Sequence, residues 1–186
     1  LRDYYKKCIA SDAFGDVLNI IENYNVLSVG PGLSDTAATN AFVDDLIKYL
    51  NKNNKRTVID ADAINVLSKS ELSSFPSDSV ITPHPVELSR LINTPVKDIQ
   101  NDRIKYAKLT AEKFGCCVVL KGNQTVVCTK DLEVFVNTSG NSALAKAGSG
   151  DVLTGIISGL MAQGVSVENA AKLGVYLHGL CGEIAS

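Results

Sequence analysis

The chain has 186 residues, of which 45% are hydrophobic and 20% charged, and its net charge is −2 at pH 7. This length allows one domain with a sizeable core, and the scattered lysines and arginines form no basic stripe, so nucleic-acid binding is not expected. An odd number of cysteines without a C-x-x-C pair excludes a disulfide framework and a zinc site and indicates a reduced, cytoplasmic protein; they are Cys8, Cys116, Cys117, Cys128 and Cys181.

Apolar runs alternate with runs of helical spacing along the chain. In chain order the pattern predicts helix and loop over 1–25, a buried strand at 25–30, an amphipathic helix at 36–50, strands at 56–62 and 79–85, a helix at 98–114 ended by Gly115, a strand at "CCVVLKG", a hairpin of "TVVCT" and "EVFVN" around "KDL", and helices after Asp151 and at 167–184. The longest uncharged run, 152–167, is too short to cross a membrane, so no membrane partner is expected.

This alternation predicts an α/β fold, with a mostly parallel sheet and helices on both faces. Ligands bind at the carboxyl ends of the strands in such sheets. The unusual residues follow the predicted strands, as "GPGLS", "DADAIN", "TPHPVE", "KGNQT" and "NTSGN". No linker or repeat interrupts the pattern, so residues 1–186 are expected to form a single domain.

The stretch "AKAGSGDVLTG" places Asp151 directly after Gly148, Ser149 and Gly150, at the start of an apolar helix. Two interpretations are open. The aspartate is either a helix N-cap or a carboxylate beside an anion-binding turn, where small residues let the backbone approach a ligand closely.

Five motifs in this order resemble the NAD(P)H-hydrate dehydratase family of the ribokinase-like superfamily: "SVGPGLS", "VIDADAIN", "ITPHPVELSRL", "VVLKGNQTVV" and "NTSGNSALAKAGSGDVLTGIISGLMAQG". The resemblance implies a ribokinase-like three-layer sandwich in which the N-terminal strands of the family are missing, so the chain is expected to be an incomplete copy. It implies an ADP- or ATP-dependent dehydratase that repairs NADHX and NADPHX, the hydrated forms of NADH and NADPH. The C6 hydroxyl of the hydrated ring is phosphorylated, and phosphate then leaves.

The resemblance also assigns roles to residues. Asp151 is implied as the catalytic base, and the amides of residues 147–150 as the anion hole for the phosphoryl group. The implied nucleotide-binding residues are Lys121, Gly122, Asn123, Gln124, Thr125, Asn141, Ser142, Ala143, Leu144, Ala145, Lys146, Ala147, Gly148, Ser149 and Gly150. Lys146, Ala147 and Gly148 stand where the family usually has Thr-Gly-Gly. Taken alone, Lys121 also fits a solvated lysine at a strand end.

The implied substrate contacts are Gly30, Gly32, His84, Pro85, Glu87, Arg90 and Asp151. A plain turn also accounts for the two glycines, and a surface ion pair accounts for Glu87 and Arg90. Asp60 and Asp62 fit either a magnesium–phosphate or ribose contact or the capping of a turn. His178, inside the last helix, is expected to be a packed core residue.

The implied cofactors are ADP or ATP with Mg²⁺, with no metal site built from the protein alone, and the family pattern implies a homo-oligomer. Two other functions remain open. One is a ribokinase-like kinase of a small alcohol such as a vitamin precursor, which would share Asp151. The other is a non-catalytic nucleotide-binding module.

Overall fold

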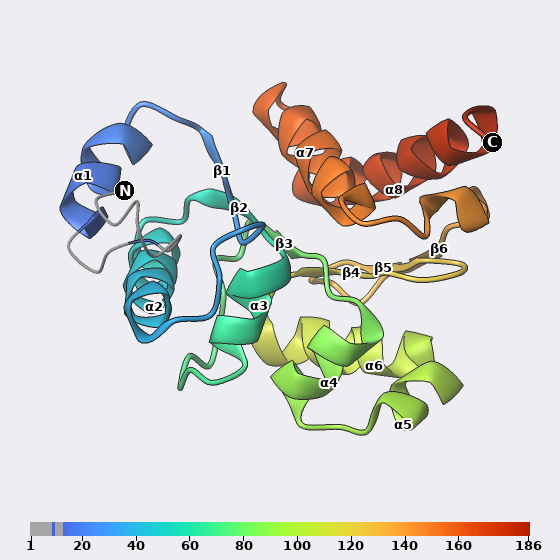
Figure 1. Ribbon diagram of the computed structural model, residues 1–186, viewed down its shortest axis with the longest axis horizontal. Coiled ribbons are helices and arrows are strands. Elements are labelled where there is room, and N and C mark those ends of the chain that lie inside the picture. The colour runs from blue at the N-terminus through green and yellow to red at the C-terminus, as the bar shows by residue number, and fades with distance from the viewer. Residues whose placement is uncertain (1–8, 10–12) are drawn as a thin grey trace.

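The computed structural model describes residue 9 and residues 13–186 (Figure 1). Cys8 and most of the first half of the predicted 1–25 segment lie outside these residues. Within them this segment forms helix α1 (Phe14–Ile21) and a turn that leads into the first strand.

Six strands form one sheet in the order β1-β2-β3-β4-β5-β6. Strands β1 to β4 are parallel, while β4, β5 and β6 pair antiparallel, which confirms the mostly parallel sheet and the predicted hairpin. The strands are β1 (Val26–Val29), β2 (Arg56–Ile59), β3 (Ser79–Ile81), β4 (Cys117–Leu120), β5 (Val126–Cys128) and β6 (Val134–Val136).

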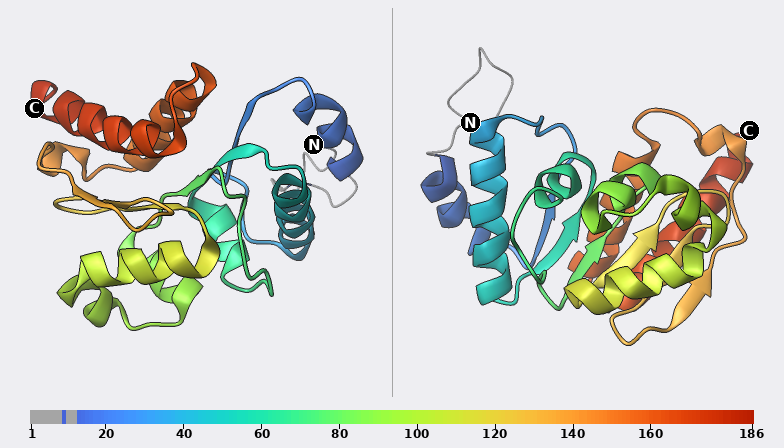
Figure 2. Two further views of the ribbon diagram at one scale, coloured as in Figure 1. Left: turned by 180° about the vertical axis from the view of Figure 1, so that it is seen from behind. Right: turned by 90° about the horizontal axis from the view of Figure 1, so that it is seen from below.

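Helices cover both faces of the sheet, as predicted, and make three layers (Figures 1 and 2). Helices α7 and α8 lie on one face, and α2 to α6 lie on the other, with α1 packed beside α2. The bounds are α2 (Ala37–Lys52), α3 (Ala61–Leu67), α4 (Pro85–Ile92), α5 (Val96–Asn101), α6 (Arg103–Phe114), α7 (Ser149–Ala162) and α8 (Val167–Ile184).

Alternate residues of the central strands feed two separate apolar cores. In β2, Val58 packs in the core beneath α7 and α8, and Ile59 packs in the core on the opposite face. Val80 and Ile81 divide in the same way. Successive side chains of a strand point to opposite faces, so a sheet covered on both sides requires apolar residues at both the odd and the even positions of each strand. This explains why the strands read as continuous apolar runs.

The predicted helix at 98–114 is wrong in one respect, because the chain breaks it at Asp102. That residue has φ −146° and ψ 73°, and its carboxylate accepts a hydrogen bond from the amide of Lys105 at 3.0 Å. Asp102 is therefore the N-cap of α6, a role that competes with its place inside a longer helix. Gly115 ends α6 in the left-handed conformation, with φ 66°, as predicted.

Three of the four described cysteines are buried thiols, and none of the four forms a disulfide. Burial raises the pKa of Cys117 to about 12. Cys181 is exposed on α8. Among the described residues, no helix combines the length and the apolar character that a membrane crossing requires.

Gly30, directly after β1, is the position where the sheet tolerates no side chain. Its φ is 138°, and a Cβ atom there would lie 1.7 Å from the carbonyl oxygen of Asp60. We expect Gly30→Ala to lower the free energy of unfolding by about 3 kcal/mol, measured by urea denaturation, because the backbone of β1 must move away from β2.

The matched control is Gly155→Ala on α7, where an added Cβ meets nothing within 4 Å. Alanine stabilises a helix interior more than glycine does, so this variant is expected to be as stable as the natural chain or more stable. Equal stability of the two alanine variants would contradict the close approach at Gly30.

Candidate active site at the carboxyl edge of the sheet

The carboxyl ends of β2, β3 and β4 meet at one edge of the sheet, where the sequence places three polar segments. Backbone hydrogen bonds join them: the amide of Asp60 donates to Val29, that of Thr82 to Ile59, and that of Lys121 to Pro83. Because these bonds continue the strand pairing, the residues after the strands are held in fixed positions.

Asp60 is the centre of a buried polar cluster. Its side chain is 1% exposed, and its two carboxylate oxygens have separate partners. Oδ1 accepts from the Lys121 ammonium at 2.7 Å, and Oδ2 accepts from the Thr154 hydroxyl on α7 at 2.8 Å. The side chain of Asp60 makes no capping bond to α3, so the structure corrects the interpretation that it caps a turn. The Lys121 side chain is 20% exposed and ion-paired, so it is not a solvated lysine.

Glu87 brings a second carboxylate to Lys121. It is 5% exposed, and its Oε2 lies 3.8 Å from the Lys121 ammonium. The same oxygen accepts from the amide of His84 at 2.7 Å, while Nδ1 of His84 accepts from the amides of Val86 and Glu87. This reciprocal capping box begins α4 after the prolines. Because the cap uses Nδ1 of His84 as an acceptor, the ring hydrogen is on Nε2, which lies 3.4 Å from Oε1 of Glu87.

Glu87 and Arg90 do not form the surface ion pair that their spacing allowed. Glu87 faces Lys121, whereas Arg90 donates to the side chain of Asn65 on α3 at 2.7 Å. A spacing of three residues on a helix places two side chains near each other without fixing their partners. Arg90 thus lies outside the Asp60 cluster.

Helix α7 begins at Ser149, three residues earlier than the helix that the sequence predicted after Asp151. Gly148 is its N-cap, with φ 85° and no side-chain cap, and Asp151 is the third helical residue. The N-cap interpretation of Asp151 is therefore wrong. The amide of Ser149 bonds to Lys146, but those of Gly150 and Asp151 have no hydrogen-bond partner within the described chain. The Asp151 side chain is exposed next to these amides.

The opening of α7 lies against the Asp60–Lys121 pair. A Cβ atom on Gly150 would lie 3.4 Å from the Lys121 ammonium and 3.8 Å from Oδ2 of Asp60. Free amides, the positive end of a helix and an ammonium group thus converge at one exposed corner. This combination attracts an anion such as a phosphoryl group.

His178 is not the packed core residue that the sequence predicted. It lies half-buried on α8, and its Nε2 is 3.1 Å from the hydroxyl of Ser149 in the first turn of α7. Burial lowers the pKa of His178 from its usual value of 6.5, although a hydrogen bond with the backbone of Ser149 acts in the opposite direction. The helical pattern of α8 did not reveal this contact, because the partner lies on another helix.

The segment 121–125 folds around a residue that sequence reasoning missed. Arg103 on α6 donates to the carbonyls of Leu120, at 2.7 Å, and Asn123. Gly122 has φ 146°, and a Cβ there would lie 3.0 Å from the Arg103 guanidinium. The loop is thus fixed from the face opposite α7, which leaves Lys121 directed at the Asp60 cluster.

The segment 141–150 forms a short 3-10 helix, η2 (Ser142–Leu144), before the glycine turn. Asn141 begins it by accepting from the amide of Ala143 at 2.9 Å, and it donates to Ser186 at 2.8 Å. Most of the segment is exposed. It therefore forms an accessible strip between α8 and the first turn of α7.

Gly30 and Gly32 lie in a tight turn after β1. The amide of Leu33 bonds to the carbonyl of Gly30 at 3.3 Å, and Gly32 has φ 73°. The amide of Ser34 then donates to the carboxylate of Asp62 at 2.8 Å. Asp62 thus holds this loop, while Asp60 faces Lys121, so the two aspartates of "DAD" have separate roles.

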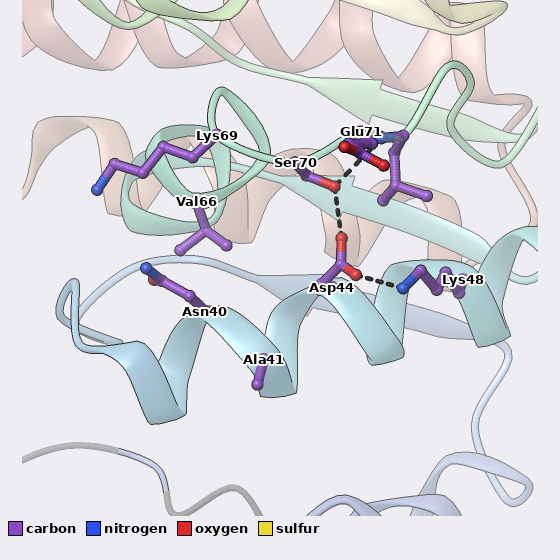
Figure 3. Close-up of a pocket in the computed structure, with 9 residues that line it drawn as sticks. Asn40, Ala41, Asp44, Lys48, Val66, Lys69, Ser70 and Glu71 are labelled. Atoms are coloured by element: carbon purple, nitrogen blue, oxygen red, sulfur yellow. Dashed lines mark hydrogen bonds and ion pairs between the residues drawn. The ribbon is translucent and has the colours of Figure 1, made fainter.

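A groove of about 520 Å³ lies elsewhere, between α2 and the residues after α3 (Figure 3). It contains none of the predicted site residues. Asp44 in its wall bonds to both Lys48 and Ser70 (Figure 3). The Asp44 carboxylate thus already has two partners, and we do not assign a ligand to this groove.

No group of three or more histidine, cysteine or acidic side chains with metal-binding geometry occurs in the described part of the chain. Asp60, a buried carboxylate near Gly150, is already bonded to Lys121 and Thr154. Magnesium commonly binds through substrate phosphates and only one or two carboxylates. The residues here therefore fit a magnesium ion only if it arrives on nucleotide phosphates.

Comparison with known proteins shows the family to which the chain belongs. The family model described as NAD(P)H-hydrate dehydratase matches residues 3–186. The chain is 41% identical to a bifunctional NAD(P)H-hydrate repair enzyme of Moorella thermoacetica, over 96% of the chain and 33% of that relative. It is 42% identical to the ADP-dependent (S)-NAD(P)H-hydrate dehydratase of Neisseria meningitidis, over 88% of the chain and 56% of that relative.

The fold matches solved structures as well. The ADP/ATP-dependent NAD(P)H-hydrate dehydratase of Bacillus subtilis, co-crystallized with ATP/Mg²⁺, superposes with a TM-score of 0.75 and 36% identity, over 86% of the chain and 55% of that structure. A ribokinase-like superfamily protein of Enterococcus faecalis gives a TM-score of 0.78 at 30% identity, over 95% of the chain and 61% of that structure. The ribokinase-like fold is confirmed, and the chain spans about a third to 61% of the length of these relatives.

His178 makes stability depend on pH. Its pKa is lower in the folded chain than in the unfolded chain, so the unfolded chain binds the proton more readily, and stability falls as pH drops through about 6.5. The free energy of unfolding is expected to fall less in His178→Gln than in the natural chain between about pH 7.5 and about pH 5.5, measured by urea denaturation. An equal fall in both proteins would show that His178 does not contribute.

Proposed function

The chain belongs to the NAD(P)H-hydrate dehydratase family, and from the geometry of its site we propose that it uses ADP or ATP to dehydrate NADHX and NADPHX. One observation carries the proposal: the exposed carboxylate of Asp151 adjoins the unpaired amides of Gly150 and Asp151, with the Lys121 ammonium beside them. A base and an anion site on adjacent residues are what phosphoryl transfer to a hydroxyl requires.

In the first step Asp151 accepts the proton of the C6 hydroxyl of the hydrated nicotinamide ring. The oxygen then forms a bond to the terminal phosphorus of the nucleotide, and the bond to the bridging oxygen breaks. The free amides at the start of α7 and the Lys121 ammonium stabilise the charge on the phosphoryl oxygens. Because these groups are fixed by the backbone and by Asp60, they need little reorganisation in the transition state.

In the second step the C6–O bond breaks and its electron pair leaves with phosphate. Loss of a proton from the neighbouring ring carbon forms the double bond and restores the reduced nicotinamide. Hydroxide is a poor leaving group and phosphate is a good one, which explains why a dehydration consumes a nucleotide.

We place the nucleotide along 141–150 and 121–125, and the hydrated ring near Gly30, Gly32 and His84. The exposed strip before α7 supports the first placement, and the half-buried His84, in the segment after β3, supports the second. When Mg²⁺ is bound it supplies charge neutralisation between the phosphates. Pro85 and Arg90, on α4, are retained as contacts of the outer rim.

We also propose a cytoplasmic homo-oligomer. Exposed apolar side chains on α8, namely Leu173 at 40%, Tyr176 at 46% and Ile184 at 77% exposure, support contact with further copies of the chain. The four cysteines among the described residues are free and three of them are buried, which supports a reducing compartment.

Asp151→Asn tests the catalytic base. The amide keeps the shape of the side chain but accepts no proton, so kcat is expected to fall on the order of a hundredfold or more, while the affinity for ATP is retained. The measurement is the return of NADH absorbance when NADHX is supplied with ADP or ATP, together with calorimetry of ATP binding.

The matched control is Asp131→Asn, which changes an exposed aspartate in the turn between β5 and β6 and is expected to leave turnover unchanged. Full activity of Asp151→Asn would refute the role of the base. A natural chain that phosphorylates another alcohol without restoring NADH would instead be a kinase, and ATP binding without any turnover would indicate a binding module.

A further inference from the structure

Lys121 could contact a phosphate without a buried partner, yet it belongs to a cluster of buried polar side chains centred on Asp60. Lys121 follows β4 and reaches the first turn of α7, where a Cβ on Gly150 would lie 3.4 Å from its ammonium. A flexible side chain can approach an anion from solvent without a fixed partner. Here instead the ammonium is held by a carboxylate that is 1% exposed.

The same carboxylate is bonded to the helix that carries Asp151. Thr154 is 2% exposed, and its hydroxyl donates to Oδ2 of Asp60 at 2.8 Å. Residues three apart on a helix lie on neighbouring parts of its surface. Asp60 therefore fixes both the position of the Lys121 ammonium and the turn of α7 that carries Asp151, the proposed base.

Packing alone does not explain this arrangement. A buried ion pair is weak evidence for stability, since apolar residues of similar volume often stabilise a protein equally well. Thr154 is likewise a polar residue on the apolar face of α7, between Leu153 and Ile157, which are both in the core. Valine would fill the same volume without needing a partner.

We infer that Asp60 is a positioning residue for phosphoryl transfer, which holds the Lys121 ammonium and, through Thr154, the first turn of α7 in the geometry that the reaction needs. The inference rests on the proposed function. We assign Asp60 a role through these two partners and not in contact with the reacting atoms, because its side chain is 1% exposed and each of its oxygens already accepts a hydrogen bond.

The inference predicts opposite effects on turnover and on ATP binding. Asp60→Asn keeps an oxygen for Thr154 but removes the charge that fixes Lys121, so kcat for NADHX is expected to fall about tenfold or more. Removing a negative charge beside the phosphate site reduces repulsion, so ATP is expected to bind about threefold more tightly by calorimetry. A merely structural role would weaken both.

Thr154 provides a second and independent pair of variants. If its hydrogen bond matters, Thr154→Ser keeps turnover near that of the natural chain, and Thr154→Val lowers kcat about fivefold or more. If only packing matters the order is reversed, because valine keeps the volume and serine loses a methyl group. This pair decides the question even if Asp60→Asn does not fold, which melting curves would show.

The matched control for Asp60 is Asp44→Asn. Asp44 also bonds to a lysine and a hydroxyl, Lys48 and Ser70, but it lies in the wall of the groove on α2 (Figure 3). We expect this variant to keep the natural kcat and ATP affinity. A similar loss in both asparagine variants would show a general effect on folding and overturn the inference.

The outcomes separate the two proposals. If the natural chain restores NADH and Asp60→Asn does so equally fast, or binds ATP more weakly, the positioning role is wrong and the proposed function stands. If the natural chain binds ATP without restoring NADH, the proposed function fails, and the change in ATP affinity of Asp60→Asn still decides the positioning role. Absence of ATP binding to the natural chain overturns both.

Discussion

The buried pair between Asp60 and Lys121 is the interaction around which this edge of the sheet is organised. It joins the ends of β2 and β4, and Thr154 extends it to α7. Withdrawing two charges from water is costly, and their attraction offsets the cost only when the geometry is good and the remaining oxygens are bonded. The separate partners of the two Asp60 oxygens meet this condition. The pair therefore ties the ends of two parallel strands to a helix on one face of the sheet.

The exposed corner above the pair follows from the way α7 begins. A glycine N-cap provides no side chain to occupy the first amides, so the helix starts with unpaired donors. Asp151 then places a carboxylate beside the positive end of the helix, where a negative charge is favoured. The same turn thus attracts an anion and carries a base, and His178 on α8 supports it from the side through Ser149.

Close packing of α8 keeps this turn in place. A Cβ on Gly174 would lie 2.6 Å from the Ile157 side chain of α7, and one on Gly182 would lie 2.6 Å from the Leu144 side chain of η2. Small residues on α8 therefore let α7 and the segment before it approach the last helix closely. The arrangement gives the strip 141–150 a firm support while leaving its outer surface exposed.

The sequence alone determined the alternation of strands and helices, the hairpin, and the family, because periodicity and short motifs are local properties of the chain. It also placed the polar segments at the carboxyl ends of the strands, which is a consequence of parallel topology. The sequence predicted one helix running through Asp102, because the spacing of the apolar residues is the same whether Asp102 caps a helix or lies inside one. Only the tertiary structure showed that Lys121 pairs with Asp60, that Thr154 joins them, and that His178 meets Ser149. These partners are 29 to 94 residues apart, and no local pattern encodes which distant side chain will share a buried oxygen or a ring nitrogen.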